Sequence, residues 1–180
     1  MNANERKHSG PELVKRILLY GVLILLAGTA QCGFFSTLSF LPATPDLVLG
    51  CLLGIALLDS GRVAMVASLP AGFFMDAIGG SGIALLPLVY FLTVALMSRL
   101  AAKLLPRFLP YAVLLIPGAA LRACFTLLQW VLANGVLPKT GQVWWGLLWE
   151  VLCTVIVCLP LYPLIRLARI PLVKKSKFNF

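Results

Sequence analysis

The positions of the basic residues constrain this chain more than any other feature. The sequence has 180 residues and contains fifteen Lys and Arg, and nearly all of these fall in alternate gaps between long apolar runs. Polytopic membrane proteins keep Lys and Arg in their short cytoplasmic loops. The spacing therefore predicts a membrane protein, and it explains the net charge of +9 without a nucleic-acid partner.

The composition supports the same class of protein. Hydrophobic residues make up 61% of the chain and charged residues only 12%, whereas soluble domains contain about 25% charged residues. A soluble domain of this length cannot bury so much apolar surface, so lipid must replace water around much of the chain. Every stretch outside the apolar runs is short, which predicts a single transmembrane domain over residues 1–180.

Six apolar runs are expected to form membrane-spanning helices. The first follows a basic tail, but Gln31 before Cys32 does not fit a lipoprotein cleavage site, so we expect this run to be retained. The second and third runs are short; crossing helices are favoured over a re-entrant pair, with local membrane thinning or burial inside the bundle compensating for their length. The expected spans are 13–33, 46–60, 63–79, 82–98, 109–133 and 143–167, between cytoplasmic tails at 1–12 and 168–180.

The basic residues also predict the orientation of the spans. With the N-terminus in the cytoplasm, thirteen of the fifteen Lys and Arg lie on the cytoplasmic side, Lys139 lies outside, and Arg122 lies within a span. The opposite orientation would reverse this asymmetry. We therefore expect an all-α integral membrane protein, a six-helix transmembrane bundle with both termini in the cytoplasm.

Arg122 and Glu150 are the charges deepest in the expected membrane, at roughly 16 Å and 12 Å from the outer ends of their helices. A short loop joins these helices, which makes them antiparallel neighbours. An intramembrane ion pair is the favoured interpretation, because two isolated charges in lipid cost more. Contact with a partner protein, and substrate or proton binding, remain alternatives. The pair predicts that Arg122→Ala and Glu150→Ala each destabilise the protein and that the charge-swapped double mutant recovers.

The segment GFFMDAIGGSGIAL contains the densest pattern of small and acidic residues. Gly72, Asp76 and Gly80 are spaced four apart, so they share one face of a continuing helix, and small residues at this spacing allow another helix to approach closely. Asp76 can accept hydrogen bonds from the following turn or cap the next helix. A packing and turn motif is favoured over a ligand- or proton-binding carboxylate.

Pro45 and Asp46 precede the second run and predict a helix start with a capping carboxylate near the membrane interface. His8 and the cysteines form no cluster with metal-ligand spacing, and the chain has no P-loop, nucleophile–base or Rossmann pattern. We therefore expect no catalytic residue, metal or cofactor, and a protein that is not an enzyme. The cysteines, interpreted as small packing residues, are Cys32, Cys51, Cys124, Cys153 and Cys158.

Two motifs resemble those of the rod shape-determining protein MreD family. They are PDLVLGCLLGIAL at 45–57 and GFFMDAIGGSGIALLPLVYFL at 72–92, where Gly82 and Leu86 match the family's G-x-x-x-L turn. The size of the chain, its six short spans and its basic C-terminal tail extend the resemblance loosely over the whole sequence. The long polar N-terminal tail and the cysteine content depart from many members of the family.

The resemblance implies both a fold and a function. The fold is similar to that of the six-helix substrate-binding subunits of energy-coupling-factor vitamin transporters. The implied function is that of a non-enzymatic scaffold in the bacterial inner membrane, which binds the membrane helix of MreC and helps organise peptidoglycan synthesis to maintain rod shape. The implied indirect partners are the MreB filament, a RodA-type glycosyltransferase and a class B penicillin-binding protein, with membrane lipids around the bundle.

Two other functions remain open. A vitamin-binding transporter subunit would need a polar pocket that opens outward, and the expected outer loops offer few groups that could form one. A lipid-handling or flippase-like protein would use Arg122 and Glu150 to contact a head group.

Overall fold

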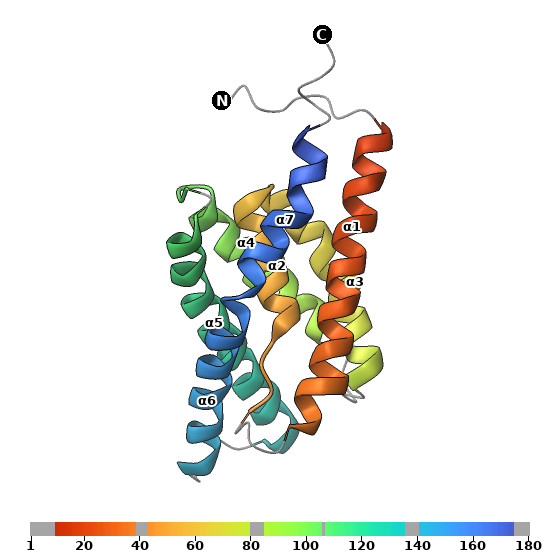
Figure 1. The fold of residues 1–180 in the computed structure, drawn as a ribbon. Coiled ribbons are helices and arrows are strands. Elements are labelled where there is room, and N and C mark those ends of the chain that lie inside the picture. Colours follow the sequence, from red (N-terminus) through yellow and green to blue (C-terminus); the bar gives the residue numbers. More distant parts are fainter. Residues whose placement is uncertain (1–9, 39–42, 80–84, 106, 136–140, 175–180) are drawn as a thin grey trace.

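The computed structural model describes residues 10–38, 43–79, 85–105, 107–135 and 141–174. Helices are the only regular elements in these ranges, and successive helices run in alternating directions, except that the last helix continues in the direction of the one before it (Figure 1). A π-helical turn, Ala30–Phe34, and a 3₁₀ turn, Phe35–Thr37, extend the first helix. The helices are α1 (Gly10–Thr29), α2 (Leu47–Leu58), α3 (Gly61–Gly79), α4 (Leu86–Ala101), α5 (Phe108–Asn134), α6 (Gly141–Cys158) and α7 (Leu161–Lys174).

Several of these helices are long and apolar enough to cross a bilayer. Three qualify alone, at Leu18–Thr37, Gly61–Gly79 and Phe108–Leu132. A fourth span is reached if Val143–Cys158 and Leu161–Leu167, which meet at a bend of 42°, are taken together. Helices α2 and α4 are apolar but shorter. The structure therefore confirms an all-helical membrane protein within the described residues, with three or four candidate spans.

The last expected span, 143–167, is not one straight helix. Helix α6 ends at Cys158 and α7 begins at Leu161, because Pro160 lacks a backbone N–H and its ring cannot continue the helix. The break leaves the Cys158 carbonyl oxygen for another donor. The Tyr111 hydroxyl from α5 lies 3.2 Å from this oxygen and 3.0 Å from the Gly50 carbonyl oxygen, so its one hydrogen is shared between the two acceptors.

Helix α2 lies at the centre of the bundle. All twelve of its residues are buried, and it packs against α1 and against each helix from α3 to α7. Since α2 is apolar on every side, a fully buried position is the one its sequence favours. Its glycines allow close neighbours: a Cβ added to Gly50 would lie 2.5 Å from the Cys158 sulfur. Helix α2 is thus a short apolar helix enclosed by the other helices of the bundle.

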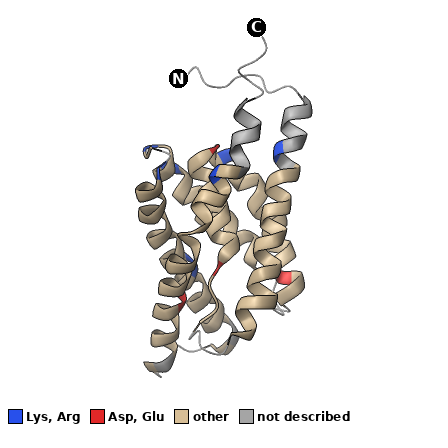
Figure 2. Cartoon of the chain, in the orientation of Figure 1, with Lys and Arg blue, Asp and Glu red and all other residues tan. Residues whose placement is uncertain are grey.

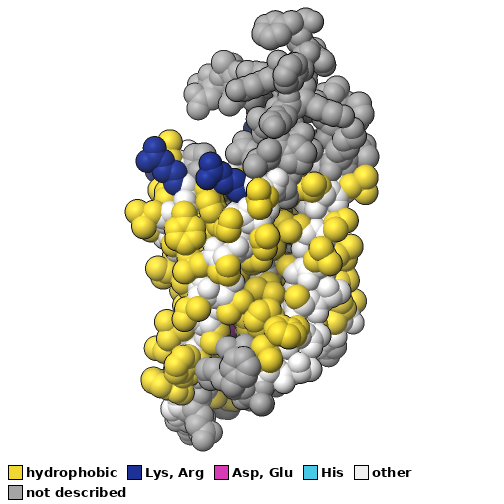
Figure 3. Space-filling model, viewed as in Figure 1, with side chains coloured by type: hydrophobic (Ala, Val, Ile, Leu, Met, Phe, Trp, Pro, Cys, Tyr) yellow, Lys and Arg dark blue, Asp and Glu magenta, His cyan; other side chains and the backbone are white. Residues whose placement is uncertain are grey.

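The outward faces of the surrounding helices are apolar. Hydrophobic side chains cover most of the face seen in Figure 3. Leu26 on α1, Leu128 on α5 and Ile156 on α6 are exposed by 63%, 50% and 64%. Large apolar side chains on the outside and a buried central helix are the pattern expected when lipid surrounds the bundle.

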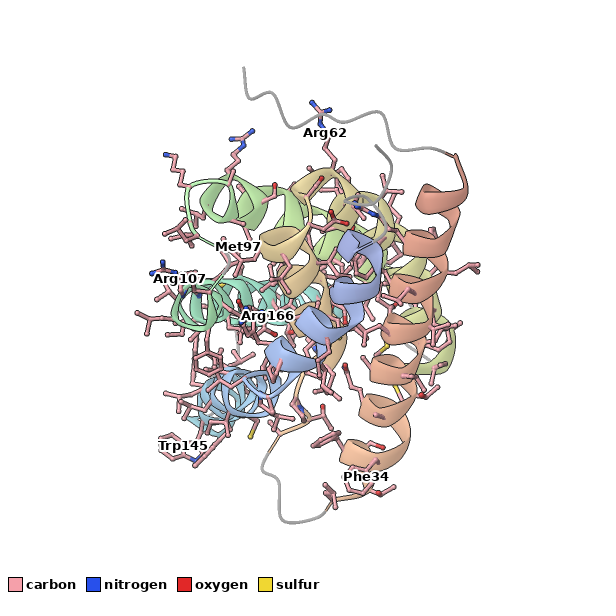
Figure 4. All side chains as sticks on the ribbon, turned by 45° about the horizontal axis from the view of Figure 1, so that its top comes forward. Phe34, Arg62, Met97, Arg107, Trp145 and Arg166 are labelled. Atoms are coloured by element: carbon pink, nitrogen blue, oxygen red, sulfur yellow. The ribbon has the colours of Figure 1, made fainter. Side chains whose placement is uncertain are left out.

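Basic side chains gather at one end of the bundle, where α1 begins and α7 ends (Figure 2). Arg62, Arg107 and Arg166 lie in this group (Figure 4). Arg122 instead pairs with Asp46, which is buried among the helices. Apart from Arg122, basic residues of the described ranges therefore gather at one end of the bundle.

Candidate functional site: a buried polar cluster

The cluster begins at Asp46, the N-cap of α2. Its carboxylate oxygen Oδ1 accepts a hydrogen bond from the Leu49 backbone N–H at 2.9 Å, which confirms the capping role predicted from Pro45 and Asp46. The Asp46 backbone N–H donates to Thr154 Oγ1 of α6 at 3.0 Å. The structure buries Asp46 among the helices, with an exposed fraction of 4%.

Gln31 completes the cap of α2, a role that the sequence did not predict for it. It lies in the π-helical turn that follows α1, and its side-chain oxygen accepts from the backbone N–H groups of Leu47 at 2.9 Å and Val48 at 3.3 Å. The first turn of a helix leaves N–H groups without partners in the helix itself, and in an apolar core these need acceptors. Gln31 and Asp46 together supply acceptors to the first three residues of α2.

Two further donors converge on the Asp46 carboxylate. The Tyr90 hydroxyl of α4 lies 3.0 Å from each carboxylate oxygen and donates to the carboxylate. Arg122 of α5 donates from Nε to Oδ2 at 3.3 Å and forms an ion pair. The carboxylate of Asp46 is thus bound from α2, α4 and α5, so that this residue joins three helices in the interior.

The structure gives Arg122 a different partner from the one the sequence favoured. Its ion pair is with Asp46, and its Nη1 donates to the Thr126 hydroxyl at 2.6 Å. Glu150 of α6 lies 3.5 Å from that hydroxyl and joins the cluster through it. The sequence therefore identified Arg122 as paired inside the chain but named the wrong partner. The burial of Asp46 depends on how α2 packs, which loop lengths do not reveal.

Gly72 and Asp76 form a second contact, where α3 meets the start of α4. Asp76 Oδ2 accepts from the Leu86 backbone N–H at 3.1 Å, which is the capping role among the alternatives considered. A Cβ added to Gly72 would lie 2.5 Å from the Pro87 nitrogen and 2.8 Å from the Leu86 carbonyl carbon. In these contacts the motif serves helix packing. Gly80 and Gly82 of the motif lie outside the described residues.

An open groove of about 360 Å³ runs between α5 and α6. Ala120, Cys124 and Leu127 line it from α5, and Leu148 and Leu152 line it from α6. This lining is apolar, whereas sites for small polar molecules contain a few fixed polar groups that orient the ligand. The groove is suited to a lipid chain or an apolar helix rather than to a charged ligand.

The described residues contain no group of three or more His, Cys, Asp or Glu that could hold a metal ion. The cysteines are free thiols; Cys51, Cys153 and Cys158 are buried, in keeping with a packing role. Comparisons with protein-family models, with curated proteins and with solved structures give no match for this chain.

Proposed function

We propose that this chain is a non-enzymatic scaffold of the bacterial inner membrane, similar to the MreD family, that binds an MreC-type protein and helps maintain rod cell shape. One observation carries the proposal: the acidic residues of the two motifs are bound by the chain itself. Asp46 is held by Tyr90 and Arg122, and Asp76 by the Leu86 N–H. A ligand-binding subunit would instead keep such groups for its ligand.

The proposal includes a topology of six crossings with both termini in the cytoplasm. The basic residues at the end where α1 begins and α7 ends support this orientation (Figure 2). In this arrangement α2 and α4 are short crossings. Burial of α2 on all sides supports its crossing role, because a buried helix need not match the lipid thickness.

The apolar groove between α5 and α6 favours a scaffold over a vitamin-binding subunit. Its lining lacks the convergent polar groups that recognise a vitamin. The exposed apolar faces of the outer helices are compatible with packing against the membrane helix of a partner, in which van der Waals contact and small residues stabilise the pair.

Depletion of the protein in the rod-shaped cells that encode it tests this function. We expect the rods to widen and become round while growth continues for several generations, because peptidoglycan synthesis is no longer directed along the cell. Re-expression of the wild-type chain should restore rods, and so should Gly79→Ala at the same level, since a Cβ at Gly79 meets nothing within 4 Å. Cells that keep their shape but need an added vitamin would contradict the proposal and favour a transport subunit.

A further inference from the structure

The buried polar cluster contains more acidic than basic groups. Within the described residues it has two carboxyl groups, Asp46 and Glu150, and one guanidinium, Arg122. Both signs of charge appear together in the middle of the bundle in Figure 2, away from the basic end. An extra negative charge inside an apolar bundle is costly and must be neutralised by a proton, a cation or a partner group.

The hydrogen bonds show which of the two carboxyl groups, Asp46 or Glu150, has its negative charge compensated. Asp46 receives the Leu49 N–H, the Tyr90 hydroxyl and the Arg122 Nε. A carboxylate with several donors and an adjacent guanidinium is stabilised in its ionised form. Within the part of the chain that the structure describes, Glu150 has one hydrogen-bond contact, with the Thr126 hydroxyl at 3.5 Å. The extra charge of the cluster therefore belongs to Glu150.

The hydrogen-bonding capacity of the Thr126 hydroxyl also points to Glu150. A hydroxyl group has one hydrogen and two lone pairs. Arg122 Nη1 donates to one lone pair at 2.6 Å, and the hydroxyl hydrogen has two acceptors within reach, the Arg122 carbonyl oxygen at 3.2 Å and Glu150 Oε1 at 3.5 Å. Glu150 therefore shares a single hydroxyl hydrogen with a carbonyl group. A shared hydrogen bond of this length stabilises a carboxylate only weakly.

We propose that Glu150 is a proton-binding site, where the carboxyl group carries a proton at neutral pH. Helix α6 packs against α2, α5 and α7. From α2 and α5 the charged groups of the cluster are Asp46 and Arg122, which neutralise each other, and Arg166 of α7 lies at the basic end (Figure 4). Tyr90 of α4 donates a hydrogen bond to Asp46 and adds no charge. With a proton on Glu150, the cluster as a whole is therefore neutral.

Infrared spectroscopy of the protein in lipid vesicles at neutral pH tests this site. The carbonyl stretch of a carboxylic acid is separate from the carboxylate bands and shifts in D₂O. We expect the wild type to show this band and Glu150→Gln to lose it completely. Arg122→Gln should double the band, because both carboxyl groups then need a proton. Asp46→Asn should also abolish it, because Glu150 then becomes the counter-ion of Arg122.

Asp59→Asn is the matched control. Asp59 forms an ion pair with Arg16 at 2.9 Å and accepts from the Tyr20 hydroxyl at 3.2 Å, so it has its own partners outside the cluster and its replacement should leave the band unchanged. A wild-type spectrum without the band, as a bound sodium ion at Glu150 would give, contradicts the proposal. A band that persists in Glu150→Gln contradicts it as well. The result is independent of the scaffold function, since either outcome is compatible with binding an MreC-type partner.

Discussion

Replacement of Gly72 by alanine should separate α3 from α4 and sharply reduce the yield of folded protein. The added Cβ would meet the backbone of Leu86 and Pro87, at 2.8 Å from the Leu86 carbonyl carbon. Backbone atoms cannot rotate away as the end of a side chain can, so the two helices must move apart. Overpacking of this kind costs about 1–3 kcal/mol or more, and the movement would also weaken the hydrogen bond from Leu86 to Asp76. The measurement is the fraction of protein that stays monodisperse in detergent after stepwise heating.

Gly79→Ala provides a matched control on the same helix. Gly79 lies seven residues after Gly72, on the same side of α3, and a Cβ there meets no atom of the described residues within 4 Å. We expect no loss of stability, and a gain of up to about 1 kcal/mol from the better helix propensity of alanine. Equal losses of stability in Gly72→Ala and Gly79→Ala would show that α3 needs these glycines for a reason other than close contact with α4.

Asp46→Ala should be the most damaging substitution in the polar cluster. It leaves the Arg122 guanidinium without its carboxylate and removes both the cap of α2 and the acceptor of the Tyr90 hydroxyl. Breaking a buried ion pair by removing one partner costs about 3–5 kcal/mol. Reversible unfolding in mixed detergent micelles, followed by circular dichroism, measures the loss of free energy of unfolding.

Glu150→Gln is the comparison that identifies the counter-ion of Arg122. Glutamine keeps the shape of glutamic acid and an oxygen that can accept from Thr126, so we expect a loss of unfolding free energy below about 1 kcal/mol. A swap of the charges at 122 and 150 should not restore stability, because Asp46 would then face a second carboxylate. A loss at Glu150→Gln as large as that at Asp46→Ala, or a recovered swap, would show that Glu150 is the principal partner of Arg122.

The features predicted from sequence are those that local patterns determine. The caps at Asp46 and Asp76 could be anticipated because each precedes or follows a helix by a short distance. The partner of Arg122 could not be, since Asp46 is 76 residues away and approaches it only through the packing of α2. Gln31 and Tyr90 are single polar residues within apolar runs, so no spacing distinguishes them from exposed or interfacial groups.

Helix lengths were predicted less well than helix positions. The run at 143–167 reads as one apolar span, but the break at Pro160 divides it between α6 and α7. The twelve residues of α2 read as a short crossing, and only the structure shows that other helices surround it on every side. Hydropathy records how apolar a segment is and does not record whether lipid or protein covers it.

The composition of the complex purified from native membranes tests the scaffold function most directly. The tagged chain would be extracted from the membranes in a mild detergent and purified with its partners. The masses of the resulting complexes would be measured by native mass spectrometry, with the untagged strain as the control. We expect a stoichiometric partner protein with one membrane helix and a periplasmic coiled coil. A stoichiometric bound vitamin together with an energising ATPase pair, and no such partner, would contradict the scaffold function.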